Sequence, residues 1–262
     1  MIRLLSTGAV TRDPDHPDLE ATLPVLAGLR VAGFELSIYS GWDLDEIAGV
    51  VEASPLRFVT AHAAKQIGAQ IVPSPQTACH EFARNCELAA RAGARLIVLH
   101  LWELPVGDAQ LERNLRVLPR LLDAADAVGV TVAVETIPTQ HATPLDNVRS
   151  AVEADDRCRV TLDTEFLAFA GQLDDAFEAD WLWEGRVAHV HVKDWNGSLR
   201  GPDGSRRYLL PGEGDLDFEA IDARLRERGY DGALTLEVSA LASDGTLQPE
   251  RLRAAEAWAL AA

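Results

Sequence analysis

Short apolar runs alternate with longer stretches of helical period along the whole chain. Eight runs rich in β-branched and other apolar residues predict strands at residues 2–6, 34–39, 56–62, 95–100, 130–136, 159–163, 187–192 and 233–238. Segments between them, such as 75–93, 111–129 and 217–229, predict helices, and each of these three ends at a glycine where a left-handed cap would lie. This alternation indicates parallel strands joined by right-handed crossovers.

Eight such units in 262 residues predict an α/β fold, a (β/α)8 TIM barrel, with residues 1–262 as a single domain. No Pro/Gly/Ser-rich linker or low-complexity segment divides the chain. An open doubly wound sheet is less favoured, because the first predicted strand-to-helix turn, residues 6–15, lacks a G-x-G-x-x-G phosphate loop. The longest connection, residues 193–217, is glycine-rich and predicts a functional loop or lid.

Composition narrows the class of protein. A formal net charge of −17 opposes binding to a phosphate backbone, so we expect no nucleic-acid partner. No apolar run approaches the ~20 residues of a membrane span, and the first residues lack the pattern of a secretory signal. We therefore expect a soluble, cytoplasmic protein that does not bind a membrane. Three cysteines without C-x-x-C spacing indicate neither a disulfide framework nor a cysteine zinc site.

Ionisable side chains gather at the carboxyl ends of six predicted strands. Side chains two apart on a strand share a face. The pairs that do so here are Thr60/His62, Val98/His100, Ala133/Glu135, Thr161/Asp163, His189/His191 and Thr235/Glu237. Active sites of TIM barrels lie at this end of the strands, and inward-facing residues there converge on the axis. Six strands therefore direct an acidic group or an imidazole at one point.

A divalent cation would make this arrangement stable. Three carboxylates and several imidazoles cannot share a dry pocket without one, because like charges at close range force protonation or separation. Glu135, Asp163, His191 and Glu237 come from four consecutive strands and would offer three oxygens and one nitrogen. This mostly hard set favours one divalent ion, Mn²⁺, Mg²⁺ or Co²⁺, with Zn²⁺ also open. About two positions of an octahedral ion would remain for substrate oxygens.

Other side chains at this end are candidate substrate contacts. His62 and His100 would touch substrate or metal, the alternative being hydrogen-bonded core histidines. His189 lies one layer deeper than His191, so we expect it to be buried and hydrogen-bonded. Lys193 lies where a cation could hold a developing oxyanion.

Two tryptophans and three arginines are further candidates for contact with a substrate. Trp102 and Trp195 each follow a strand, where an indole could cover the apolar face of a sugar, the alternative being packing beneath loops. Arg200, Arg206 and Arg207 in the long loop could clamp a phosphate or carboxylate, or be solvated charges. The sequence therefore leaves phosphorylated and free substrates undecided.

Four stretches are distinctive: "VAVET" (132–136), "VTLDTE" (160–165), "HVHVKD" (189–194) and "PGEGDLDFEAIDARLRERGYDGALTLEVS" (211–239). Through them nearly the whole chain resembles the xylose isomerase-like TIM-barrel superfamily. That superfamily includes sugar (phosphate) isomerases and epimerases, inosose dehydratases, hydroxypyruvate isomerases, 3-dehydroshikimate dehydratases and endonuclease IV. The resemblance implies that the superfamily's metal ligands map onto Glu135, Asp163, His191 and Glu237.

The departures from the superfamily pattern are informative. Phe166 stands where many members have a histidine, and the loop after residue 193 lacks the Asp-x-His pair that completes the zinc cluster of endonuclease IV. These losses and the acidic charge argue against cleavage of DNA. Thr136 replaces the asparagine that often follows the strand-five glutamate, which leaves that contact open.

We predict a divalent-metal-dependent isomerase or epimerase of a sugar or sugar-like hydroxy-ketone, working by proton transfer through a metal-bound enediolate. Glu135 and Glu237, on opposite sides of the ion, would act as base and acid. The alternatives are a metal-dependent dehydratase of the inosose or 3-dehydroshikimate type using the same site, an endonuclease IV-like phosphodiesterase, and a non-catalytic binding subunit. The expected partner is a small sugar or polyol-derived molecule, and homo-oligomerisation is left open.

Overall fold

Eight parallel strands close into a barrel in the computed structural model, which describes residues 1–11, 18–103 and 107–261. Each strand pairs with the next along the chain, and β8 pairs with β1. The strands are β1 (Ile2–Ser6), β2 (Phe34–Ser37), β3 (Phe58–His62), β4 (Leu96–Leu99), β5 (Thr131–Glu135), β6 (Arg159–Asp163), β7 (Val187–Val192) and β8 (Ala233–Leu236). The predicted TIM barrel is confirmed.

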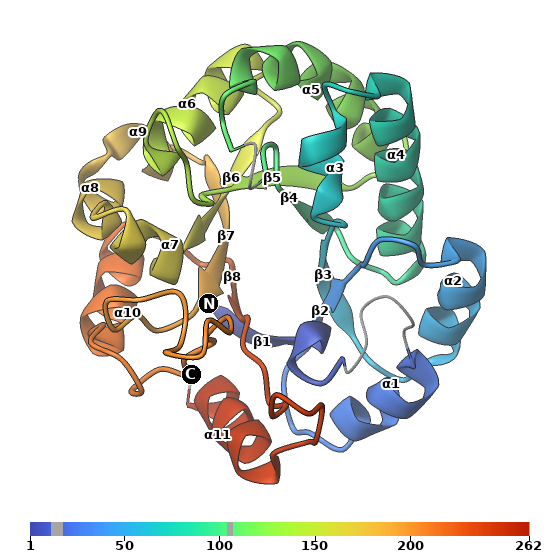
Figure 1. The fold of residues 1–262 in the computed structure, drawn as a ribbon, viewed down its shortest axis with the longest axis vertical. Helices are drawn as coiled ribbons and strands as arrows, with labels where there is room; N and C mark the ends of the chain where they lie inside the picture. The colour runs from blue at the N-terminus through green and yellow to red at the C-terminus, as the bar shows by residue number, and fades with distance from the viewer. Residues whose placement is uncertain (12–17, 104–106, 262) are drawn as a thin grey trace.

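The helices form an outer ring around these strands (Figure 1). They are η1 (Thr7–Ala9), α1 (Leu19–Ala27), α2 (Leu44–Ala53), α3 (Gln66–Gln70), α4 (Pro75–Arg91), α5 (Leu111–Asp126), α6 (Pro144–Ala154), α7 (Thr164–Phe169), α8 (Leu173–Glu178), α9 (Asp180–Trp183), α10 (Phe218–Glu227) and α11 (Pro249–Leu260). No helix in the described ranges is both long and apolar enough to cross a membrane.

The three helices predicted from their apolar period are present as α4, α5 and α10. In α5 the buried positions Leu118, Leu121, Leu122 and Ala125 recur at helical spacing and face the barrel. The glycine after α5, Gly129, has a φ of +71°, which an L side chain rarely adopts. The glycine therefore lets the chain turn directly from the helix into β5.

The strands end slightly earlier than the apolar runs suggest. β4 ends at Leu99 and β8 at Leu236, so His100 and Glu237 are the first residues beyond their strands. Register then places the polar side chains side by side: Asp163 pairs with His191, and Glu35 with Thr60. The carboxyl ends of the strands thus carry a buried polar layer above an otherwise apolar core.

Candidate metal centre

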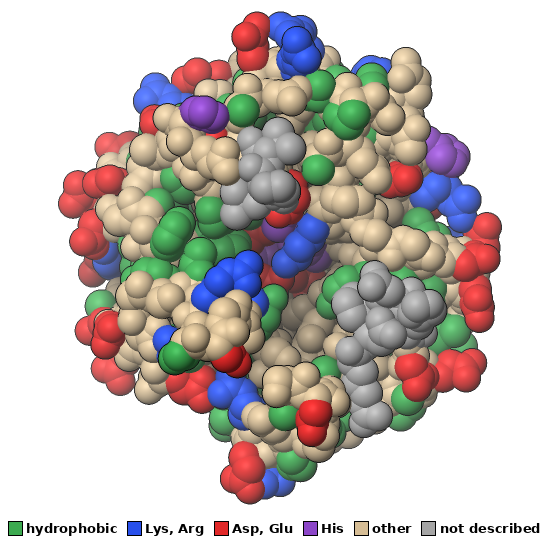
Figure 2. Space-filling view, viewed as in Figure 1, with side chains coloured by type: hydrophobic (Ala, Val, Ile, Leu, Met, Phe, Trp, Pro, Cys, Tyr) green, Lys and Arg blue, Asp and Glu red, His purple; other side chains and the backbone are tan. Residues whose placement is uncertain are grey.

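Four side chains from consecutive strands converge on one point. Glu135, Asp163, His191 and Glu237 each offer one ligand atom, and these atoms all lie within 4.8 Å of one another. Nδ1 of His191 is 2.9 Å from Glu135 Oε1 and 3.8 Å from Glu237 Oε2. Acidic, histidine and basic side chains are visible at the bottom of a central depression on this face (Figure 2). The predicted ligand set is therefore brought together.

Asp163 serves two neighbours with its two carboxylate oxygens. Oδ1 accepts the backbone N–H of Phe166 at 2.8 Å and so caps helix α7. Oδ2 makes no hydrogen bond within the described residues, although Nζ of Lys193 lies 2.6 Å away. The hydroxyl of Thr136 accepts the backbone N–H of Asp163 at 2.9 Å, so Thr136 helps to place this carboxylate.

Lys193 lies inside the ligand set. Its ammonium group contacts both Asp163 and Glu237, and its side chain is 1% exposed. Burial alone would lower the pKa of Lys193, but the charges of Asp163, Glu237 and Glu135 raise it well above its usual value. A positive charge is therefore already favoured at the point where the carboxylates meet.

One lysine does not neutralise the cluster. Burial, with the nearby charges of Glu135 and Glu165, raises the pKa of Asp163 to about 7 in spite of Lys193. Burial also disfavours ionised Glu237, yet Lys193 and Lys65 hold the pKa of Glu237 well below its usual range. The acidic groups thus exceed the cations around them. A hard divalent ion fits both this excess and the set of three oxygens and one nitrogen.

Two histidines flank Glu135 on the side of β3 and β4. Oε2 of Glu135 lies 2.7 Å from His100 Nε2 and 3.3 Å from His62 Nε2. Nδ1 of His100 is 2.6 Å from Glu103, whose side chain is 25% exposed. His100 therefore links the buried Glu135 to a carboxylate that reaches solvent.

A cavity of about 350 Å³ adjoins the cluster, and its lining includes Glu237 of the cluster and the neighbouring His62. Lys65 also borders this cavity, with Nζ 3.5 Å from Glu237 Oε1. Most of the remaining lining side chains carry hydroxyl groups: Ser6, Thr11, Ser37, Tyr39, Tyr208 and Ser239. A lining of this kind suits a ligand with many hydroxyl groups.

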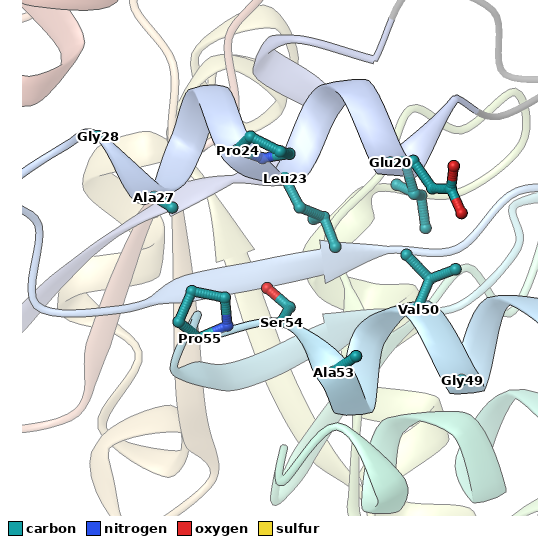
Figure 3. Close-up of a pocket in the computed structure, with 11 residues that line it drawn as sticks. Glu20, Leu23, Pro24, Ala27, Gly28, Gly49, Val50, Ala53, Ser54 and Pro55 are labelled. Atoms are coloured by element: carbon teal, nitrogen blue, oxygen red, sulfur yellow. The ribbon is translucent and has the colours of Figure 1, made fainter.

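A larger groove of about 740 Å³ lies outside the barrel, between α1 and α2 (Figure 3). Leu23, Pro24 and Val50 give it an apolar lining, and Glu20 is the ionisable residue among those that border it. With a single carboxylate among its lining residues, the groove offers no cluster of groups for metal binding or acid–base chemistry.

The profile of the xylose isomerase-like TIM barrel family matches residues 28–259. The chain belongs to this family. A curated relative, an uncharacterized protein of Methanocaldococcus jannaschii, is 25% identical over 162 residues, which are 58% of this chain and 53% of that protein. The chain thus spans about half the length of the curated relative that it matches.

Solved structures of similar fold include three sugar-enzyme barrels. The apo 3-keto-D-glucoside 4-epimerase from E. coli is 20% identical with a TM-score of 0.71, covering 100% of both chains. The D-psicose 3-epimerase with D-tagatose from Clostridium cellulolyticum H10 is 15% identical with a TM-score of 0.71, covering 99% and 97%. A sugar phosphate isomerase/epimerase from Parabacteroides distasonis is 16% identical with a TM-score of 0.66, covering 100% and 96%. At these identities the likeness shows the shared fold.

Two aromatic residues of this xylose isomerase-like barrel lie differently from one another. Trp102 is fully buried, and its indole N–H donates to the carbonyl oxygen of Pro138 at 3.0 Å. Its polar atom and its surface are thus used in packing, which agrees with the alternative of an indole packed beneath loops. Trp195 is partly buried on the loop after β7, with its ring 5.8 Å from that of Phe169. Its contact with substrate stays a prediction.

Several charged residues of the site were missed by the sequence reasoning. Glu35 is fully buried in the middle of β2, and Glu165 is 1% exposed and paired with Arg206. The guanidinium group of Arg206 lies over the ring of Phe166, the residue that stands where many family members have histidine. A lone acidic residue inside an apolar strand was the available signal for Glu35. Arg206 is thus paired with Glu165 and is not a solvated loop charge.

Proposed function

We propose that this barrel is a divalent-metal-dependent isomerase or epimerase that moves a proton next to the carbonyl group of a sugar or sugar-like hydroxy-ketone. The observation that carries the proposal is the convergence of three carboxylates and one imidazole beside a hydroxyl-lined cavity. The sugars named with two proteins of similar fold, 3-keto-D-glucoside and D-tagatose, agree with a ketone substrate. The cytoplasmic location stays a prediction.

Glu135, Asp163, His191 and Glu237 would hold the ion, which the chemistry of the donor set favours as Mn²⁺, Mg²⁺ or Co²⁺, with Zn²⁺ also open. When bound, such an ion supplies Lewis-acid polarisation of a carbonyl group, which lowers the cost of removing a neighbouring proton.

The two glutamates would share the proton transfer from different sides. Glu237 borders the cavity and its side chain is 14% exposed, so it can reach a carbon of a molecule bound there. Glu135 is fully buried at the point where the four candidate ligands converge, and its Oε2 contacts His100. Two carboxylates on different sides of one carbon are what epimerisation needs, because the proton leaves one face and returns to the other.

The surrounding groups would position charge and protons. Lys193, held between Asp163 and Glu237, would stabilise the negative oxygen of the enediolate through its ammonium group. The chain of contacts from Glu135 through His100 to Glu103 offers a route for proton exchange with solvent. His62 and Lys65, at the cavity wall, would orient substrate hydroxyl groups.

The test combines metal content with proton exchange. The purified protein would be assayed for bound metal by mass spectrometry, stripped with chelator, and reloaded with Mn²⁺ in D₂O. D-Fructose, D-tagatose, D-psicose, a 3-keto-D-glucoside, an inosose and 3-dehydroshikimate would then be followed by NMR. We expect solvent deuterium at the carbon next to the carbonyl group and an epimer or isomer as product.

Each outcome of this test is decisive. A dehydrated enone instead of an isomer would assign the site to the dehydratase alternative. Absence of both metal binding and exchange across the panel would overturn the proposal and favour a binding subunit. The stripped protein is the matched control, since its exchange should fall to background and return with Mn²⁺.

A further inference from the structure

Glu35 lies where a carboxylate has no obvious structural use. It is a fully buried residue in the middle of β2, and its Oε1 makes no hydrogen bond within the described residues. Burying an ionised group is costly unless hydrogen bonds or charged partners compensate it. The closest charged or polar neighbours are two imidazoles of β7 and one hydroxyl of β3.

The imidazole of His191 lies between two carboxylates. Nδ1 faces Glu135 Oε1 at 2.9 Å, on the side of the proposed metal ligands. Nε2 faces Glu35, at 3.2 Å from Oε1 and 3.3 Å from Oε2. A neutral imidazole carries its proton on one nitrogen and a lone pair on the other, so its orientation alone does not decide which nitrogen can bind a cation.

We propose that Glu35 is a positioning residue that keeps the proton of His191 on Nε2 and thereby leaves the lone pair of Nδ1 for the metal. The inference rests on the metal centre of the proposed function. With the opposite tautomer, the Nδ1 proton would point at the ligand oxygens and the Nε2 lone pair would face the Glu35 carboxylate. A carboxylate behind a metal-binding histidine typically fixes both its tautomer and its ring orientation.

Glu35 is itself oriented by its neighbours. The hydroxyl of Thr60 donates to Glu35 Oε2 at 2.9 Å, across the register that pairs the two residues. Nε2 of His189 lies 3.1 Å from the same oxygen. These contacts orient the carboxylate, both of whose oxygens lie close to Nε2 of His191. His189 thus belongs to the support beneath the centre and not to the ligand set of four.

Metal affinity tests the proposal without reference to catalysis. Glu35→Leu removes the acceptor, and Glu35→Gln keeps the volume and one acceptor oxygen. The Kd for Mn²⁺ would be measured by competition with a fluorescent chelator, beside the Tm of each metal-free variant. Loss of a group of this kind typically costs 10–100-fold in metal affinity, so we expect about that loss in Glu35→Leu and a smaller one in Glu35→Gln.

A charge-matched control separates tautomer control from the mere loss of a buried negative charge. Glu165→Gln removes a buried carboxylate near the centre that does not contact His191. We expect a weaker effect on the Kd than in Glu35→Leu. Equal losses in Glu165→Gln and Glu35→Leu, or a Kd in folded Glu35→Leu within about twofold of the parent, would overturn the proposal.

NMR on the parent protein keeps the proposal testable if Glu35→Leu does not fold. In ¹⁵N-histidine-labelled, Zn²⁺-loaded protein, we expect a proton attached to Nε2 of His191 and none on Nδ1. A proton on Nδ1, or no metal binding by the parent protein, would refute the assignment. If the protein binds metal with the expected tautomer but exchanges no deuterium into any sugar, the role proposed for Glu35 stands. Only the proposed isomerase or epimerase function is then refuted.

Discussion

The barrel contains two kinds of buried carboxylate, and the partners of each kind differ. Asp194 is fully buried and accepts backbone N–H groups from four residues of its own loop, Trp195, Gly212, Gly214 and Leu216, at 2.7–3.0 Å. Asp163, nearby on β6, uses only Oδ1 in this way. Its Oδ2 points toward Lys193 and the other acidic groups of the centre.

The hydrogen-bond partners of a buried carboxylate therefore distinguish one that stabilises the fold from one that takes part in chemistry. Four amide donors surround the carboxylate of Asp194, and hydrogen bonds to an ionised acceptor are stronger than neutral ones. Acidic groups that face other acidic groups lack that compensation and need a cation. Asp194 should therefore govern stability, and Glu135, Asp163 and Glu237 should govern metal binding and turnover.

The largest expected effect is on turnover, from a change in the acidic cluster. Glu237→Gln should lower kcat by about 10²–10⁴-fold, the usual contribution of a general acid or base. The free energy of unfolding of the metal-free protein should also fall, because Lys193 and Lys65 lose an ionic partner, although Asp163 still pairs with Lys193. Kinetics and urea unfolding of the same preparation check both. A large loss of stability with normal turnover would reverse the comparison.

Asp194→Asn should have the opposite profile. The amide nitrogen would face backbone N–H donors that now bind a carboxylate, so we expect a loss of about 2–4 kcal/mol in the free energy of unfolding. Urea unfolding followed by circular dichroism measures it. An unchanged unfolding midpoint would show that the introduced amide and water satisfy the backbone N–H groups as well as the carboxylate does. Asp194 would then not be what holds the loop in place.

A smaller loss of stability is expected from Gly214, a glycine in the loop that Asp194 holds. A Cβ on Gly214 would lie 2.5 Å from Asp194 Oδ1 and from the carbonyl oxygen of Trp195. Gly214→Ala should therefore cost about 1–3 kcal/mol, since the loop must shift away from its anchor. Gly212, whose φ is +92°, is strained by any side chain for a different reason. Glycine 49, with open space around it, provides a control position for the Gly→Ala change. Equal unfolding midpoints for Gly214→Ala and the parent would contradict the close approach.

Much of this arrangement could be predicted from the sequence because it follows local rules. The period of two on each strand placed Glu135, Asp163 and His191 on the inner face, and the alternation of strands and helices predicted the barrel. Which acid receives amide donors could not be predicted, since it depends on how residues 212–216 return to Asp194.

The residues that were missed depend on contacts distant in sequence. Glu35 meets His191 across 156 residues, a contact that exists only because the sheet closes on itself. Trp102 looked like a sugar-facing indole because it follows a strand. It is fully buried, and its indole N–H donates to the carbonyl oxygen of Pro138, a partner 36 residues away that the strand pattern did not reveal.

The smallest expected effect concerns a second acid of the structural kind. Asp108 is buried and accepts the backbone N–H groups of Gln140, His141 and Ala142 and the amide of Asn147. Burial alone would raise the pKa of Asp108, but these donors lower it from 3.8 to about 2. Because the folded pKa lies below the unfolded one, the stabilisation is complete above about pH 4 and is lost as the pH falls toward 2.

Asp108→Asn should therefore lower the free energy of unfolding at neutral pH by about 1–2 kcal/mol and flatten its dependence on pH between about 4 and 2. Urea unfolding at a series of pH values compares the variant with the parent. A parallel pH dependence in both proteins would mean that Asp108 titrates alike folded and unfolded, and that its amide donors do not stabilise the charge. The contrast would then rest on Asp194 alone, whose four donors lie within its own loop, whereas those of Asp108 lie on the segment after β5 and on α6.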